Sequence, residues 1–209
     1  MGTSRKEDTI VTEHFFTIND ATYRYTVTGE GEALLLFHGF TGSSATWEKF
    51  IDAFSLTYQV ITVDLPGHGK TTAKTPRTME MFSHDILKLM QHLQHEKVHL
   101  LGYSMGGRTS LSFAMYYPEK VATVMLESAS PGLKTEDERA ARIKQDTKLA
   151  EKIMTEGVPS FVAYWEKIPL FDTQKTLSEK IQKQIRHERL SHTKEGLADS
   201  LLFMGTGKQ

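Results

Sequence analysis

Residues 98–108 decide the fold, and they read Val98-His99-Leu100-Leu101-Gly102-Tyr103-Ser104-Met105-Gly106-Gly107-Arg108. A short apolar run leads into the pattern Gly-x-Ser-x-Gly, and residues 109–114 continue as a predicted helix. A serine on a sharp turn between a strand and a helix is typical of a nucleophile held at the edge of a sheet. The flanking glycines let the backbones of the strand and the helix pass closely, which makes such a turn possible. Ser104 is therefore the predicted nucleophile. The amide of Met105, in the first helical turn, is a predicted oxyanion donor.

Composition and charge exclude several classes of protein. The chain has 209 residues, a formal net charge of -1 and no cysteine. The near-neutral charge gives no indication of a basic surface for nucleic acid or for a membrane. The lack of cysteine excludes disulfides and cysteine-based metal sites. The first eight residues are polar and contain no apolar segment of the kind found in secretory signals. We therefore expect a cytoplasmic protein with a small-molecule substrate, no nucleic-acid or membrane partner, no metal and no cofactor.

Strands and helices are predicted to alternate over the first 130 residues. Two β-rich runs around the turn Asn19-Asp20 predict an antiparallel hairpin, and the later apolar runs are continuous, as in strands buried on both faces. Thr78 is a predicted helix cap. The predicted strands are 14–18, 23–27, 33–37, 60–63, the run that begins at Val98, and 121–126, and the predicted helices begin near 47, 78 and 105. This order predicts an α/β fold whose sheet is mostly parallel, with ligands at the carboxyl ends of the strands.

The character of the sequence changes after residue 130. Residues 133–204 are predicted to be helical, with a capping box from Thr135 to Glu138 and interruptions at Pro159, Pro169 and Gly196. A helical block that follows a strand end is most simply a cap over that end of the sheet. We therefore expect a hydrolase-like core over residues 1–130 and a helical cap over residues 131–209.

Three motifs together resemble the α/β-hydrolase fold, from about Phe15 onward. They are His38-Gly39-Phe40-Thr41-Gly42, Asp64-Leu65-Pro66-Gly67-His68-Gly69 and Gly102-Tyr103-Ser104-Met105-Gly106-Gly107. Further segments resemble the 2-succinyl-6-hydroxy-2,4-cyclohexadiene-1-carboxylate (SHCHC) synthases of menaquinone biosynthesis. They are residues 102–108, Ser130-Pro131-Gly132-Leu133, Ala140-Ala141-Arg142, residues 197–201 and residues 204–207.

The narrower resemblance implies a lyase that eliminates pyruvate from a substrate with several carboxylates. It implies a Ser–Asp–His triad that abstracts a proton, with Ser104 as its serine and the amides of Phe40 and Met105 as oxyanion donors. The substrate-binding residues that it implies are Tyr103, Arg108, Arg142, Trp165 and Arg186. The arginines suit the substrate that the resemblance implies, because guanidinium groups bind carboxylates bidentately. Arg108 lies one helical turn after Ser104, close to the predicted nucleophile.

Each of these side chains also has a plainer interpretation. Arg108 could form a buried salt bridge, Arg142 and Arg186 could lie on a solvated helix face, and Trp165 could belong to the core of the cap. The Phe40 side chain could merely pack. His38 is expected to organise its loop, and the remaining histidines, His192 among them, are expected to have no catalytic role.

No aspartate or histidine of this sequence can be assigned to the rest of the triad. In this fold the acid and then the histidine follow the serine along the chain, after the cap. The sequence stops at Gly207-Lys208-Gln209, about 60 residues short of that pattern at roughly 30 residues per strand–helix unit. We therefore expect a chain truncated relative to a working enzyme, lacking two strand–helix units and inactive by itself. The strand at 121–126 would then be a sheet edge that invites self-association.

Two other functions compete with the synthase. An esterase or carbon–carbon hydrolase of the same fold keeps the serine turn but needs no cluster of arginines. A non-catalytic binding protein of hydrolase-like fold needs no base for Ser104, which otherwise is an unactivated hydroxyl.

Overall fold

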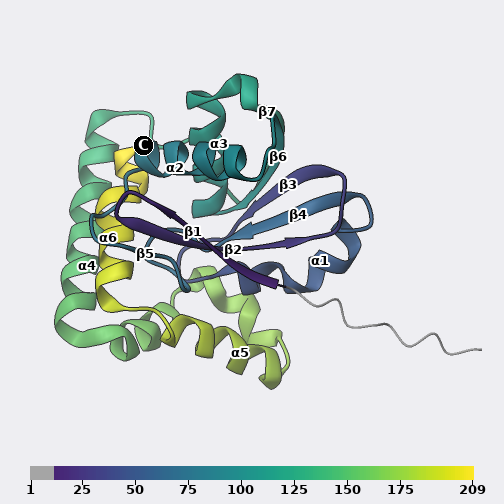
Figure 1. Ribbon diagram of the computed structural model, residues 1–209. Helices are drawn as coiled ribbons and strands as arrows, with labels where there is room; N and C mark the ends of the chain where they lie inside the picture. Colours follow the sequence, from purple (N-terminus) through teal and green to yellow (C-terminus); the bar gives the residue numbers. More distant parts are fainter. Residues whose placement is uncertain (1–11) are drawn as a thin grey trace, which may run out of the picture.

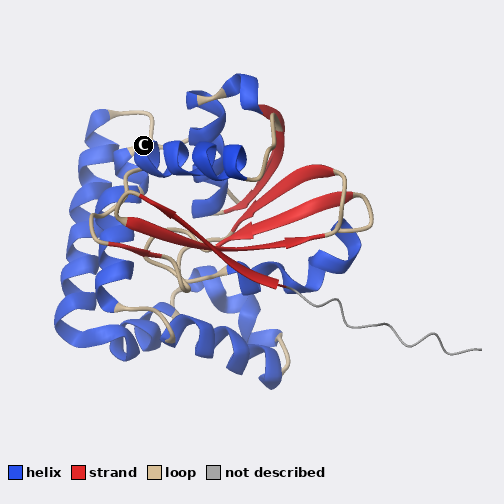
Figure 2. Ribbon diagram, viewed as in Figure 1, coloured by secondary structure: helices blue, strands red, loops and turns tan. Residues whose placement is uncertain are grey.

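The computed structural model describes residues 12–209, and its centre is a seven-stranded sheet (Figures 1 and 2). The sheet has the order β1-β2-β4-β3-β6-β7, and the short β5 pairs with β2. β1 and β2 are antiparallel, whereas β3, β4, β6 and β7 are mutually parallel. The strands are β1 Thr12–Ile18, β2 Ala21–Thr28, β3 Glu32–Phe37, β4 Tyr58–Val63, β5 Thr72–Ala73, β6 Val98–Tyr103 and β7 Val121–Glu127.

Helices cover both faces of this sheet because its central strands are apolar on both sides. On one face, α2 (Met79–His92) and α3 (Met105–Tyr116) pack through Phe82, Ile86 and Phe113 against alternate residues of β3 and β4. On the other face, η1 (Ser44–Trp47) and α1 (Glu48–Phe54) cover Leu34 and Leu36. A single turn, η2 (Pro118–Lys120), leads from α3 into β7.

The segment after β7 contains a second apolar core. Figure 1 shows α4 (Glu136–Trp165) and α6 (Lys194–Met204) side by side across one end of the sheet, with α5 (Glu179–Leu190) below them. Apolar residues of α4 and α6 pack together, and Phe40 from the loop after β3 reaches this cluster. The turns η3 (Pro169–Thr176) and η4 (Thr206–Lys208) complete the layer. No helix within residues 12–209 is both long and apolar enough to cross a membrane.

Most predicted elements are confirmed, including the hairpin, the Thr78 cap and the capping box of Thr135 and Glu138. One difference concerns the break expected at Pro159. The segment labelled α4 consists of two helices that meet at a kink at Gly157, whose φ is 80°, two residues before Pro159. The strand predicted at 121–126 forms an edge of the sheet as β7. The absence of a signal segment was predicted from residues 1–8, which lie outside the described residues.

Candidate active site

Ser104 lies on a strained turn between β6 and α3. Its backbone has φ 52° and ψ -112°, a combination that L-residues rarely adopt. A Cβ on Gly102 would lie 2.2 Å from the carbonyl oxygen of Gly106, and a Cβ on Gly106 would lie 2.0 Å from that of Phe37. Glycine is therefore required on both sides of the turn, as the sequence predicts. The Ser104 amide donates to the carbonyl of Glu127 in β7, which fixes the turn to the neighbouring strand (2.8 Å).

Two backbone amides beside Ser104 have no acceptor within residues 12–209. One belongs to Met105, the first residue of α3, and the other to Phe40, in the loop that follows β3. Free N–H groups at a helix start carry partial positive charge and suit an anionic oxygen. The arrangement is chemically able to stabilise a developing oxyanion next to Ser104.

A cavity of about 660 Å³ lies between the carboxyl ends of the strands and the helix α4. Six of the eight predicted site residues line it: Phe40, Ser104, Met105, Arg108, Arg142 and Trp165. Arg108 is 8% exposed and donates to the Met204 carbonyl (2.9 Å) and to the Gln209 side chain (3.2 Å). No carboxylate in residues 12–209 forms a salt bridge with it. Burial, together with the charge of Arg142, lowers the pKa of Arg108 to about 10, although Asp146 acts in the opposite direction.

Arg142 and Trp165 enter the cavity from α4. The Arg142 Nε donates to Asp146 Oδ1 at 2.8 Å, one helical turn further on. The Trp165 ring packs edge-on against Phe40, with the ring centroids 5.6 Å apart, and its buried indole N–H has no acceptor among the described residues. Trp165 therefore belongs both to the apolar core and to the cavity wall, the two alternatives that its sequence left open.

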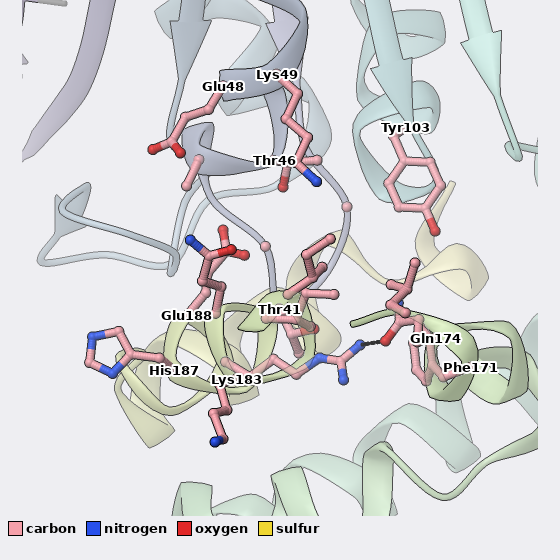
Figure 3. Close-up of a pocket in the computed structure, with 18 of the residues that line it drawn as sticks. Thr41, Thr46, Glu48, Lys49, Tyr103, Phe171, Gln174, Lys183, His187 and Glu188 are labelled. Atoms are coloured by element: carbon pink, nitrogen blue, oxygen red, sulfur yellow. Dashed lines mark hydrogen bonds between the residues drawn. The ribbon is translucent and has the colours of Figure 1, made fainter. Parts of the chain in front are cut away.

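Tyr103 borders a different cavity. This cavity, of about 1200 Å³, lies between the loop after β3 and the helix α5, and Phe40 lines both cavities (Figure 3). In Figure 3 the Tyr103 ring extends from β6 toward Gln174 and Phe171. Arg189 reaches the same cavity from α5, where it donates to Gln174 Oε1 (3.0 Å) and lies 4.5 Å from the Phe171 ring centre.

Arg186 does not line the cavity that contains Ser104. Its side chain is 46% exposed and pairs with Glu166. One turn further along α5, the Arg189 side chain is only 6% exposed, and its burial lowers its pKa. The docking of α5 turns position 189 inward and position 186 outward. The sequence pattern favoured Arg186 by spacing alone, and nothing in the local sequence distinguishes the two arginines.

Three buried histidines hold the loop that carries Phe40. His38 accepts from the Leu65 amide (2.9 Å) and donates to the Gly39 carbonyl (2.8 Å). His68 accepts from the Thr41 amide (3.2 Å) and donates to the Pro66 carbonyl (3.0 Å). The expectation that His38 organises this loop is confirmed.

His192, between α5 and α6, completes this group. It accepts from the Gly69 amide (3.3 Å) and donates to the Thr41 carbonyl (3.0 Å), so it joins the helical layer to the loop. Each of the three rings therefore uses one nitrogen as an acceptor. Burial lowers the pKa of all three, that of His38 to about 4. No local sequence pattern predicts the contacts of His192, because its partners lie more than 120 residues away along the chain.

Comparison with known proteins identifies the family of this chain. The family model for the alpha/beta hydrolase fold matches residues 32–204. A Bacillus subtilis (strain 168) protein named "Putative 2-succinyl-6-hydroxy-2,4-cyclohexadiene-1-carboxylate synthase" is 47% identical over 201 residues, which are 92% of this chain and 72% of the relative. The structure of MenH from S. aureus has a TM-score of 0.84 and 34% identity, over 90% of this chain and 72% of that one.

The chain belongs to the α/β-hydrolase fold family, and within it to the SHCHC synthases. An SHCHC synthase of Escherichia coli O1:K1 / APEC is 30% identical over 138 residues, which cover 66% of this chain and 54% of the E. coli enzyme. The chain thus matches about half the length of the E. coli synthase and about three quarters of the B. subtilis relative.

The described residues offer no partner for the hydroxyl of Ser104. Within residues 12–209, no histidine or carboxylate is hydrogen-bonded to Ser104 Oγ. The rings of His38, His68 and His192 are hydrogen-bonded to backbone groups of the Phe40 loop and of the loop after β4. Ser104 therefore lines a cavity together with Arg108, Arg142 and the residues of two unbonded amides, Phe40 and Met105, but no base contacts it among the described residues.

Proposed function

We propose that this chain carries the substrate site of an SHCHC synthase, a lyase that eliminates pyruvate from the enolpyruvyl polycarboxylate intermediate of menaquinone biosynthesis. One observation carries the proposal. Arg108 is buried beside Ser104, and no carboxylate of the described chain pairs with it. A buried charge normally has a partner, so this guanidinium is suited to an anion supplied by a ligand.

Arg142 extends the same argument. Its Nε is used by Asp146, which orients the guanidinium and leaves the two Nη groups for a ligand in the cavity that Arg108 also lines. Two guanidinium groups in one cavity suit a ligand with at least two carboxylates, each bound through paired N–H donors. An esterase for neutral substrates has no use for this charge.

The chemistry follows from the position of Ser104. A base at this site removes a proton from carbon next to a carbonyl, the electron pair forms a carbon–carbon double bond, and the bond to the enolpyruvyl oxygen breaks. The leaving group takes up a proton and is released as pyruvate. The amides of Phe40 and Met105 would stabilise negative charge on the carbonyl oxygen while the proton is removed. In this role Ser104 abstracts a proton and forms no acyl intermediate.

Ser104 needs a base to act in this way, and none contacts it within residues 12–209. We therefore propose that the 209-residue chain binds the polycarboxylate but does not turn it over. The test combines binding of the product SHCHC, measured by titration calorimetry, with release of pyruvate from the enolpyruvyl substrate SEPHCHC, measured by a coupled assay. We expect binding without pyruvate, and binding at least tenfold weaker in Arg108→Ala. Pyruvate release at the rate of the B. subtilis relative would overturn the claim about the base, and unchanged affinity in Arg108→Ala would overturn the claim about the site.

A non-catalytic binding protein is the second candidate, and the lack of a base at Ser104 favours it. A chimera distinguishes the two, in which this chain is followed by the part of the B. subtilis relative that it does not match. Turnover by the chimera supports the synthase. Binding without turnover, in a chimera that melts cooperatively, supports the binding protein.

A further inference from the structure

Arg108 uses one of its three guanidinium nitrogens within the described part of the chain. Its Nη1 donates to the Met204 carbonyl at 2.9 Å and to Gln209 Oε1 at 3.2 Å. A guanidinium has five N–H bonds, two of which belong to Nη1, so both hydrogens of Nη1 are used. Nε and Nη2 have no acceptor within residues 12–209. Their three N–H bonds are therefore left for a ligand.

The two free nitrogens are accessible, and Arg108 lines the cavity of Ser104. Neither Nε nor Nη2 is among the unpaired polar atoms that the described chain seals from solvent. Both lie on one edge of the planar group, where two parallel N–H donors can bind one carboxylate. The edge formed by Nη1 and Nη2 is not available, because Nη1 is already used. Arg108 is thus left with one fork, the edge formed by Nε and Nη2.

Gln209 contacts Arg108 at two points. Besides accepting from Nη1, its side chain donates from Nε2 to the Arg108 carbonyl oxygen in α3 (3.3 Å). The two bonds fix which end of the amide faces the guanidinium, because the reversed amide would direct its own NH2 donors at the cation. A neutral acceptor also leaves the positive charge of Arg108 uncompensated. Gln209 thus orients the guanidinium and preserves its charge.

The turn η4 brings Gln209 to this position. η4 packs on α4, the helix that also carries Arg142. A Cβ on Gly207 would lie 2.6 Å from the Arg139 carbonyl oxygen, so the turn approaches α4 this closely because residue 207 has no side chain. The helix that carries one cavity arginine therefore also places the residue that holds the other.

We propose that Gln209 is a positioning residue for substrate binding: with the Met204 carbonyl it holds Nη1 of Arg108, so that Nε and Nη2 bind a carboxylate side-on. The inference rests on the proposed function, since it assigns a further determinant of the same site. Arg142 offers the other geometry, because Asp146 uses its Nε and leaves Nη1 and Nη2 for end-on binding. The cavity then presents two different forks to a ligand with two carboxylates.

A double-mutant cycle separates positioning from a general structural role. SHCHC is titrated calorimetrically into the 209-residue chain, Gln209→Met, Arg108→Lys and the double variant Gln209→Met/Arg108→Lys. Methionine keeps the length of the side chain without the amide, and lysine keeps the charge at position 108 without the fork. Gln91→Met is the matched control, the same change at an exposed position of α2. Thermal melting of each variant verifies that it is folded.

We expect Gln209→Met to bind SHCHC at least about threefold more weakly than the unaltered chain, because the guanidinium is no longer held in its binding orientation. In the Arg108→Lys background the same change should cost less than about twofold, because no fork remains to be positioned. Gln209→Glu should bind at least about tenfold more weakly than the unaltered chain, since its carboxylate pairs with Arg108 and competes with the ligand. Gln91→Met should match the unaltered chain.

The results that would overturn the inference are distinguishable from a failure of the proposed function. A smaller loss in Gln209→Met, an equal loss with and without Arg108→Lys, or unchanged affinity in Gln209→Glu rejects positioning by Gln209 while the arginine site stands. Absence of SHCHC binding to the unaltered chain rejects the polycarboxylate site itself, and with it the inference.

Discussion

The side chain of Ser104 points out of the sheet because its backbone adopts a strained conformation. A non-glycine residue at φ 52° and ψ -112° stores strain of about 1–3 kcal/mol. The surrounding structure maintains it through the glycines of the turn and the hydrogen bond to Glu127. Strain at this residue thus has a function, because it exposes the hydroxyl to the cavity.

Ser104→Gly should therefore stabilise the protein. Removal of Cβ relieves the strain, and we expect the free energy of unfolding in urea to rise by about 1 kcal/mol after the entropy of glycine is subtracted. Ser104→Ala is the matched control, since it loses the hydroxyl but keeps Cβ, and its stability should stay within about 0.5 kcal/mol of the unaltered chain. Equal stability of the glycine and alanine variants would show that the turn is not strained.

Residues of the site differ in how far the sequence predicts them. Ser104 and Arg108 were predicted because both belong to one contiguous motif, and a helical turn fixes their spacing. Arg189 and Asp146 were not predicted as site residues, because their inward orientation depends on how α5 and α4 dock. Docking is decided by packing between segments far apart in the chain, which no local pattern records.

At the scale of elements, the histidines that hold the Phe40 loop make it sensitive to pH. Burial lowers the pKa of His38 to about 4, and those of His68 and His192 are lowered for the same reason. The unfolded chain binds these protons near pH 6.5, so between pH 6.5 and 4 the unfolded state binds more protons than the folded one. The contribution of the three neutral histidines to the free energy of unfolding is complete above pH 6.5 and is lost as the pH falls toward 4.

We expect the free energy of unfolding, measured in urea, to fall between pH 7 and pH 5, with about 2 kcal/mol of the fall from His38 alone. His192→Gln keeps a donor for the Thr41 carbonyl but cannot titrate, so its free energy of unfolding should fall less over this pH range than that of the unaltered chain. His187→Gln, which replaces an exposed histidine of α5, should fall like the unaltered chain. An identical pH dependence in His192→Gln would contradict the role given to this ring.

Helix α6 docks on the loop after β4 through two glycine backbones. A Cβ on Gly196 would lie 2.4 Å from the Gly67 carbonyl oxygen, so Gly196→Ala must displace the helix. We expect this change to lower the free energy of unfolding by about 1–3 kcal/mol, as overpacking does. The neighbouring Glu195→Ala, at an exposed position, should change it by less than about 0.5 kcal/mol. Melting curves of the two variants provide the measurement.

The elements themselves were largely predictable. Continuous apolar runs marked the buried strands, and capping residues marked the starts of α2 and α4. The position of the kink in α4 was not predictable. Pro159 lies near the start of the helical stretch after the kink, where its missing N–H is tolerated. A proline in the sequence indicates an interruption but not whether the chain bends there or two residues earlier.

At the scale of the whole molecule, β7 is an edge of the sheet, and within residues 12–209 no strand pairs with its outer side. Met125 and Leu126 on this strand are 41% and 43% exposed, and an apolar edge of this kind pairs readily with another chain. We expect the 209-residue chain to self-associate with rising concentration in sedimentation velocity. The variant Met125→Lys/Leu126→Lys should associate at least tenfold more weakly, because charges on an edge strand oppose pairing. Equal association of the two proteins would place the contact elsewhere.

The account depends most on one property of the whole molecule, that the cavity closed by α4 over the sheet holds an acidic ligand between Arg108 and Arg142. The most direct measurement is calorimetric titration of SHCHC into the 209-residue chain and into Arg108→Ala/Arg142→Ala, at two salt concentrations. The account predicts saturable binding that weakens at least 100-fold in the double variant and loses its dependence on salt. Equal affinity of the two proteins for SHCHC would contradict it.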